Sequence, residues 1–195
     1  VARNLASYRE KGPNRTTGLL IDALREAGVE GMTLLDIGGG IGAIQHELLK
    51  AGAIEASSVE ASSAFVAAAQ AEAQRQGLAD RTHYYQGDFI TLANEIPPAD
   101  IVTLDRVICC YHDMPSLVSA SAARARKLYG LVYPRDSWWI KTLIAFQNAF
   151  LRLTRNSFRF YIHATHEVDA LLREHGLRKR TTHVTPFWQV VLYAR

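Results

Sequence analysis

From residue 32 onward, short apolar segments of strand length alternate with longer segments of helical spacing. Strands are predicted over 32–37, 54–60, 82–86, 100–104 and 127–133, and helices over 43–50, 62–76, 115–126, 138–153 and 165–175. Because each helix returns the chain to the sheet edge at which the next strand begins, strands in this order pair in parallel. The pattern therefore predicts an α/β fold: a doubly wound, mainly parallel sheet with helices on both faces.

The end of the chain departs from this alternation. Two β-rich runs, 177–184 and 187–193, are separated by Thr185-Pro186, which is too short a connection for a helix. Strands joined so closely pair antiparallel. We therefore expect a C-terminal antiparallel hairpin, which brings the sheet to seven strands.

A chain of 195 residues is expected to form one domain. We predict a single domain over 1–195, in which 1–30 forms a helical cap and 134–162 a helical insertion on the substrate side. Hydrophobic residues make up 48% and charged residues 21% of the chain, a globular composition. The formal charge of +3 fits an anionic substrate or weak attraction to nucleic acid, and it specifies neither.

The two cysteines, Cys109 and Cys110, are adjacent in the sequence. A disulfide between neighbours would be strained, so we expect no disulfide framework. The absence of such a framework predicts a reducing, cytoplasmic location. No apolar run approaches the ~20 residues that a membrane-spanning helix needs. We expect neither a transmembrane segment nor a metal site.

A glycine-rich turn, Gly38-Gly39-Gly40-Ile41-Gly42, follows the first expected strand and precedes a helix. Glycine lets the backbone turn sharply and approach a ligand closely, and the helix N-terminus offers free N–H groups. Asp36 stands two residues before the turn. Such a turn predicts a nucleotide-binding site, although a tight strand-to-helix connection alone would explain it.

Acidic residues follow the next two strands. Glu60 ends the second strand, and its carboxylate offers two oxygens to ribose hydroxyls. Asp88 follows the third strand, where it would accept from an adenine amino group while Phe89 packs against the ring. Taken singly, Glu60 is explained as a surface acid and Asp88 as a turn cap. Together with the glycine turn they predict an adenosine site, because doubly wound sheets bind ligands at this rim.

These residues resemble a known family. Asp36-x-Gly38-x-Gly40-x-Gly42, then Glu60, Gly87-Asp88 and Asp105 are similar to the class I methyltransferases that use S-adenosylmethionine (SAM). The resemblance implies that Asp36 and the glycines hold the methionine and ribose part, Glu60 the ribose, Asp88 and Phe89 the adenine, and that Asp105 and Arg106 lie beside the methionine end. The cofactor-binding residues predicted in this way are Asp36, Gly38, Gly39, Gly40, Gly42, Glu60, Ala61, Asp88, Phe89, Asp105 and Arg106.

The C-terminal part loosely resembles the magnesium-protoporphyrin O-methyltransferases. The matching segments are Leu131-Val132-Tyr133-Pro134, Phe160-Tyr161-Ile162-His163-Ala164, Val168-Asp169-Ala170-Leu171, Gly176-Leu177 and Thr185-Pro186-Phe187-Trp188. That group methylates a propionate of a tetrapyrrole. It tends to carry a His-Tyr pair after the fourth strand, where this chain has Cys110-Tyr111 followed by His112.

His112 and Tyr111 are the candidate catalytic residues, since the transferred methyl group is expected to face the loop after the fourth strand. His112 would deprotonate a hydroxyl acceptor, because the pKa of histidine lies near neutral pH, and Tyr111 would line the pocket. The alternatives are a loop histidine and a core tyrosine. A carboxylate acceptor is already ionised and needs no base.

The predicted function is methyl transfer from SAM to a small molecule, at a hydroxyl or carboxylate oxygen, with S-adenosylhomocysteine (SAH) as the product. The acceptor is expected to be aromatic or anionic, and no nucleic acid is expected. One alternative is an NAD(P)-dependent oxidoreductase, which Asp36 disfavours because a dinucleotide turn usually has an apolar residue there. The other is a nucleic-acid methyltransferase, which Leu104-Asp105-Arg106-Val107 disfavours because an Asn/Asp-Pro-Pro-aromatic run is typical at that place.

The aromatic residues of the 134–162 insertion have three possible roles. The helix predicted over 138–153 would pack on the sheet, roof a large flat substrate, or lie on a bilayer surface. The sequence alone leaves these roles open.

Overall fold

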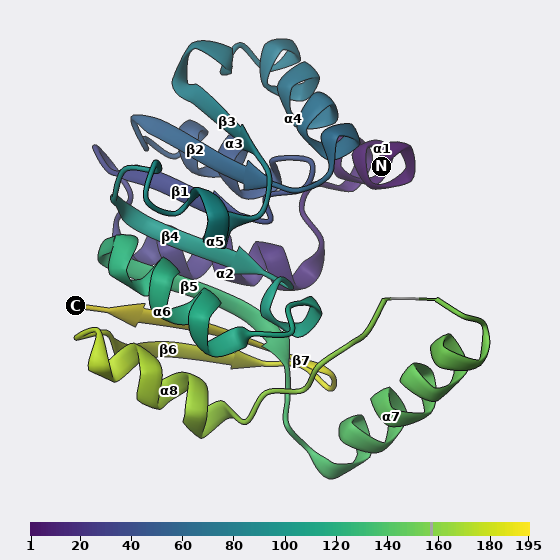
Figure 1. Ribbon diagram of the computed structural model, residues 1–195. Helices are drawn as coiled ribbons and strands as arrows, with labels where there is room; N and C mark the ends of the chain where they lie inside the picture. The colour runs from purple at the N-terminus through teal and green to yellow at the C-terminus, as the bar shows by residue number, and fades with distance from the viewer. Residues whose placement is uncertain (157) are drawn as a thin grey trace.

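The computed structural model describes residues 1–156 and 158–195, and it places all seven strands in one sheet (Figure 1). The strand order is β3-β2-β1-β4-β5-β7-β6. Strands β1 to β5 pair in parallel, and β7 pairs antiparallel with β5 on one side and with β6 on the other. The predicted fold class, including the C-terminal hairpin, is confirmed.

Periodicity located most elements to within two residues. The strands are β1 (Thr33–Ile37), β2 (Glu55–Glu60), β3 (Thr82–Gln86), β4 (Ala99–Asp105), β5 (Ala125–Pro134), β6 (Arg178–Val184) and β7 (Trp188–Ala194). The helices are α1 (Ala2–Lys11), α2 (Arg15–Ala27), α3 (Ala43–Lys50), α4 (Ser63–Arg75), α5 (Phe89–Leu92), α6 (Met114–Arg124), α7 (Trp138–Leu153) and α8 (Thr165–Glu174), with short 3-10 turns at Ala79–Arg81 and Ile108–Cys110.

The chain reverses its direction of winding between β1 and β4, the two central strands of the sheet. From β1 the chain proceeds to β2 and β3 on one side, and from β4 to β5 on the other. The carboxyl ends of β1 and β4 therefore border the crevice in which open α/β sheets bind ligands.

Alternate residues of the central strands supply two separate cores. Leu34 and Ile101 pack with α2, α3 and α4 on one face, whereas Leu35 and Val102 pack with α5, α6 and α8 on the other. Residues that alternate along a strand point to opposite faces, so an almost continuous apolar run is what a strand buried on both faces requires.

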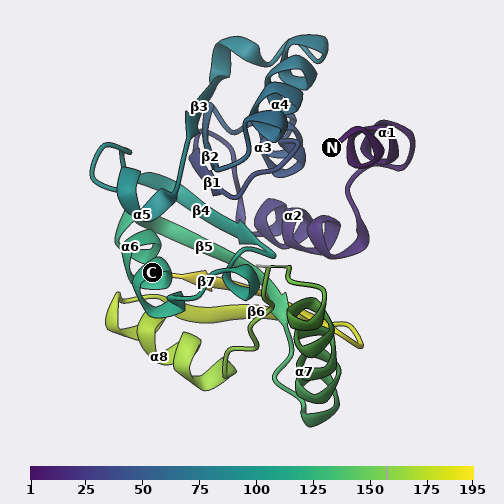
Figure 2. The ribbon, with the colours of Figure 1, turned by 45° about the vertical axis from the view of Figure 1, so that its right-hand side comes forward.

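Helix α1 lies at the edge of the molecule (Figure 2), and polar contacts attach it to the body. The hydroxyl of Tyr8 donates to Glu47 Oε1 at 3.0 Å, and Arg9 Nε donates to Glu72 Oε2 at 2.8 Å. The Glu72 side chain is fully buried, and its hydrogen bond with Arg75 lowers its pKa to about 2. A buried carboxylate held by cations fixes the position of the N-terminal helix, because breaking the pair would leave an uncompensated charge.

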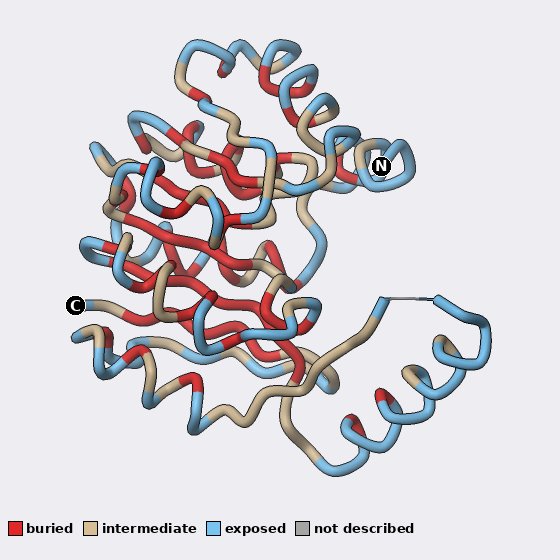
Figure 3. The backbone as a smooth tube through the Cα atoms, in the orientation of Figure 1, coloured by how far each residue is buried: buried red, intermediate tan, exposed pale blue. Residues whose placement is uncertain are grey.

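Helix α7 stands away from the sheet, at the end of the molecule where the β strands β1, β4 and β5 finish (Figure 1). Most of it is exposed (Figure 3), and only Ile140 and Ile144 are buried. Among the described residues, no helix has the length and apolar character to cross a membrane.

Packing of α2 on β5 requires a residue without a side chain at Gly130. A Cβ there would lie 2.7 Å from Leu20 Cδ1. We expect Gly130→Ala to destabilise the fold by roughly 1–3 kcal/mol through overpacking, measured by thermal unfolding. The control is Gly18→Ala on α2, where nothing lies within 4 Å of the added Cβ. An unfolding temperature of Gly130→Ala equal to that of the unmodified chain would show that α2 does not pack on β5 as described.

Candidate cofactor and acceptor site

A cavity of about 580 Å³ opens at the carboxyl ends of β1, β2 and β4. This volume lies within the range of small-molecule pockets, roughly 300–1,000 Å³. Seven of the predicted cofactor residues line it: Asp36, Gly38, Gly39, Gly40, Glu60, Asp105 and Arg106. The structure therefore brings residues from three different strand ends to one cavity.

The glycine turn is joined to β2 by a backbone hydrogen bond. Gly38 N–H donates to Val59 O at 2.7 Å, and Gly38 has a φ of 68°. A Cβ at this position would overlap the Val107 side chain. Gly38 is thus required both by its left-handed backbone and by the close approach of the segment after β4.

Glu60 closes the turn from the side of β2. Its Oε2 accepts from Gly40 N–H at 3.1 Å, and its Oε1 accepts from Ser62 N–H at 2.9 Å. A carboxylate oxygen has two lone pairs, so each oxygen keeps one for a ligand. The two amides therefore fix the orientation of the carboxylate without saturating it.

Asp36 lies beneath the turn and is 1% exposed. Its Oδ1 accepts from Thr103 Oγ1 at 2.7 Å, whereas its Oδ2 has no partner among the described residues. Burial raises the pKa of Asp36 to about 7. An unpaired oxygen on a buried acid that lines a cavity is a site for a donor or cation from a ligand.

Asp105 and Arg106 form the wall from β4. Arg106 Nε donates to Asp105 Oδ1 at 3.0 Å, and the Thr17 hydroxyl donates to Asp105 Oδ2. Arg106 adopts a φ of 61°, in the left-handed region that side chains seldom occupy. Its backbone is fixed there by donation from its N–H to Val132 O at 2.8 Å.

Four predicted cofactor residues lie outside the cavity lining. Gly42 is the N-cap of α3, and Ala61 is exposed. Asp88 caps α5 by accepting from Ile90 N–H at 2.9 Å, and Phe89 is buried in the core beneath α5. Asp88 nevertheless follows the end of β3 beside Glu60, because Gly87 N–H donates to Glu60 O at 3.1 Å.

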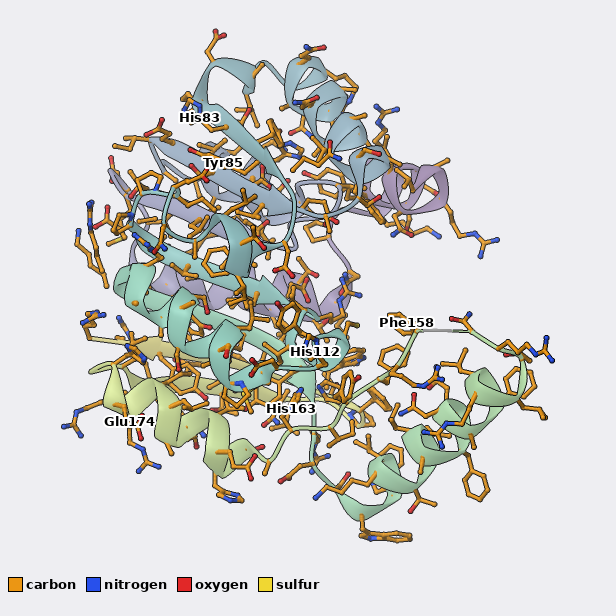
Figure 4. All side chains as sticks on the ribbon, viewed as in Figure 1. His83, Tyr85, His112, Phe158, His163 and Glu174 are labelled. Carbon is orange, nitrogen blue, oxygen red and sulfur yellow. The ribbon has the colours of Figure 1, made fainter. Side chains whose placement is uncertain are left out.

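The two candidate catalytic residues also lie outside the lining. Tyr111 donates to both oxygens of Asp88, at 3.0 and 3.2 Å, and its ring stacks on His112 with centroids 5.3 Å apart. His112 is exposed on the loop after β4 (Figure 4). Asp88 and Tyr111, which the sequence assigned to separate tasks, are hydrogen-bonded partners.

A less polar wall completes the cavity. It includes Cys109, Cys110, Phe160 and Trp188. The segment that carries Phe160 lies over the turn after β4, because Tyr161 N–H donates to Cys109 O at 2.8 Å and His163 Nε2 lies 2.8 Å from Ile108 O. Burial lowers the pKa of His163, so the ring is neutral at neutral pH.

The sequence missed most of the lining that comes from the N-terminal cap. Asn4, Ser7, Tyr8, Asn14 and Thr17 all reach the cavity. Only Asn14 could have been located from the sequence, because asparagine favours the N-cap of a helix. It caps α2 by accepting from the N–H groups of Thr16 and Thr17. The expected cap over 1–30 thus contributes to the cavity.

Residues 34–129 match a protein family described as "Methyltransferase domain". The chain is a SAM-dependent methyltransferase. The matched range begins in β1 and ends in β5, so it contains the glycine turn, Glu60, Asp88 and Asp105. No curated protein matches the chain significantly.

Solved structures share the methyltransferase fold. A magnesium-protoporphyrin IX methyltransferase from Synechocystis PCC 6803 with bound SAH has a TM-score of 0.75 and 19% identity, over 92% of this chain and 81% of that one. The same enzyme with bound SAM has a TM-score of 0.70 and 18% identity, over 92% and 77%. An O-methyltransferase family protein from Burkholderia thailandensis has a TM-score of 0.74 and 16% identity, over 100% of this chain and 60% of that one.

Ionisation of Asp36 should oppose folding when the cavity is empty. The folded pKa of about 7 exceeds the unfolded value of about 4, so stability is lost as pH rises between these two values. We expect Asp36→Asn to stabilise the ligand-free protein by roughly 2–4 kcal/mol at pH 8 and to have little effect near pH 4. Urea unfolding at a series of pH values measures this difference. Parallel pH profiles for the two proteins would contradict it.

Proposed function

We propose that this methyltransferase transfers the methyl group of SAM to an oxygen atom of a small molecule. The observation that carries the proposal is the single cavity in which a glycine turn and three carboxylates, Asp36, Glu60 and Asp105, adjoin an apolar wall with Phe160 and Trp188. The first part suits the cofactor and the second an organic acceptor.

The residues of the first part fit SAM. Glu60 has a free lone pair on each oxygen for the ribose hydroxyls, and the turn offers backbone close to the ligand. The unpartnered Oδ2 of Asp36 suits the cationic methionine end. Asp105 and Arg106 would bound that end, while Gly42, Ala61, Asp88 and Phe89 keep their predicted roles around the ribose and adenine.

The charge of the cavity favours SAM over a dinucleotide. Three acidic side chains and Arg106 line it, and Arg106 is already paired with Asp105. A nicotinamide dinucleotide would bring a negatively charged pyrophosphate beside these acids, whereas SAM brings a sulfonium and an ammonium group. Like charges in a partly enclosed cavity repel strongly, so the part of the lining around the glycine turn selects for a cationic ligand.

Bound SAM supplies an electrophilic methyl group, and the remaining task of the protein is alignment and exclusion of water. Tyr8, Asn4 and Ser7 on α1 border the cofactor part, and α1 is held there by the buried Glu72. On the acceptor side, Phe160 and Trp188 shield the cavity from solvent. These side chains would orient an acceptor without taking part in proton transfer.

A carboxylate acceptor agrees best with the lining. No histidine lines the cavity in the described parts of the chain, and His112 is exposed. A hydroxyl acceptor would need a base, and His112 with Tyr111 remains the candidate pair for that alternative. A carboxylate needs none, so we propose formation of a methyl ester on an anionic acceptor with an apolar or aromatic body.

Glu60 should be essential for cofactor affinity. In Glu60→Gln the amide nitrogen faces either Gly40 N–H or Ser62 N–H, so one fixed hydrogen bond is replaced by a repulsion. We expect SAH to bind about tenfold or more weakly by calorimetric titration.

The matched control is Glu55→Gln, at the opposite end of β2, where the acid is half exposed and pairs with His83. It should leave SAH affinity unchanged. An unmodified chain that binds NADH but not SAH would overturn the cofactor assignment.

The methyl ester should be recognised by its lability. When the protein is incubated with methyl-labelled SAM and the small-molecule fraction of a cell extract, we expect label in a product that releases volatile methanol on treatment with alkali. Ethers and N-methyl products are stable to that treatment. His112→Ala should keep label transfer within about threefold, because an ionised carboxylate needs no base. Loss of a true general base would instead typically cost 10²–10⁴-fold.

Two results would contradict the ester. Alkali-stable label in the product would point to a hydroxyl or nitrogen acceptor. A loss of label transfer of about 100-fold in His112→Ala, with SAH affinity retained, would establish His112 as the base and favour a hydroxyl.

A further inference from the structure

The outward face of α7 is apolar. The described residues contain ten exposed large hydrophobic side chains, and seven of them lie between 138 and 158. The most exposed are Leu153 at 82%, Trp138 at 79%, Phe146 at 72% and Phe150 at 65%. Single exposed apolar residues are common on protein surfaces, but a cluster of this kind marks an interaction site.

The apolar residues form one stripe along the helix. At about 100° per residue, Trp138, Phe146, Leu153, Trp139, Phe150 and Leu143 fall within an arc of about 140°. Ile140 and Ile144, the buried residues of α7, lie on the opposite side of the helix. The helix is thus attached to the protein through a narrow apolar seam and presents its wider apolar face to solvent (Figure 3).

The charge around this stripe has one sign. Residues 137–164 contain Lys141, Arg152, Arg155 and Arg159, and no aspartate or glutamate. Lys141 and Arg152 lie on one side of the helix, about 60° and 40° beyond the edge of the apolar arc and about three turns apart, and both are exposed. Long cationic side chains at such a border reach the headgroups while the apolar stripe enters the acyl region.

This positive charge decides whether the apolar face of α7 binds a second copy of the chain or an anionic bilayer. In a symmetric dimer through α7, each copy would place its cations near the same cations of the other copy, with no acid in the segment to pair them. The headgroups of an anionic bilayer would offer a negative partner to each of these cations. The paired tryptophans at the start of α7 also suit the headgroup region, where tryptophan is enriched.

We propose that α7 is a peripheral membrane-binding helix, which lies in the headgroup region of an anionic bilayer with its Trp138–Phe146–Phe150 stripe inserted. The length of 16 residues, about 24 Å, suits a helix that lies along the surface. The opposite side of α7 remains packed on the protein through Ile140 and Ile144.

Vesicle flotation tests this role. We expect the full chain to float with vesicles of phosphatidylcholine and phosphatidylglycerol, and to float weakly with phosphatidylcholine alone. The triple variant Trp138→Ser/Phe146→Ser/Phe150→Ser should bind the anionic vesicles about tenfold or more weakly, because inserted apolar area and charge together set the affinity. The variant Lys141→Gln/Arg152→Gln should lose most of the preference for anionic lipid.

A matched control removes exposed apolar side chains elsewhere. Ile54→Ser/Val184→Ser alters residues that are 53% and 57% exposed, and it should bind vesicles like the unmodified chain. Retained SAH binding shows that each variant is folded. Failure of the full chain to float would overturn the proposal. A triple variant that floats as well as the unmodified chain would also overturn it. The same holds if the triple substitution leaves vesicle binding unchanged and instead converts a dimer to a monomer in light scattering.

Discussion

The site depends on one constraint, the sharp reversal of the chain at Gly38–Gly40 directly after β1. Two hydrogen bonds hold it against β2, from Gly38 N–H to Val59 O and from Gly40 N–H to Glu60 Oε2, and a third, from Ser62 N–H to Glu60 Oε1, orients the Glu60 carboxylate. Glu60 is the last residue of β2, so the pairing of β1 with β2 places its carboxylate beside Gly40. The hydrogen bond to Gly40 N–H in turn fixes the conformation of the glycine turn. The cavity exists because the chain turns here without a side chain, at the point where the sheet changes its direction of winding.

Much of the fold could be predicted because the relevant information is local. A helix repeats every 3.6 residues and a strand every two, so α3 and α7 were located to the residue. The acids at the carboxyl ends of β1, β2 and β4 were predicted for a related reason, since parallel strands end at the same edge. The α5 turn was missed because four residues carry too little periodicity.

What the sequence could not predict is pairing between distant residues. Tyr8 reaches Glu47 over 39 positions, Arg9 reaches Glu72 over 63, and Thr17 reaches Asp105 over 88. No spacing rule connects such pairs, so the contribution of α1 and α2 to the cavity appears only in the folded chain. The same holds for Asp88 and Tyr111, whose hydrogen bonds join a residue predicted to bind adenine to one predicted to be catalytic.

Helix α7 illustrates a different limit, because periodicity locates a helix without saying which face is buried. Its apolar residues satisfy a core pattern, yet the wider stripe faces solvent. The helix is nevertheless tied to the cavity. Asn148 Nδ2 donates to Phe160 O at 2.7 Å, and Phe160 N–H donates to Asn148 Oδ1 at 3.0 Å. Phe160 lines the cavity, so these two hydrogen bonds connect α7 to the cavity wall. The helix with the exposed apolar stripe is therefore also the helix that positions the Phe160 backbone beside the proposed acceptor.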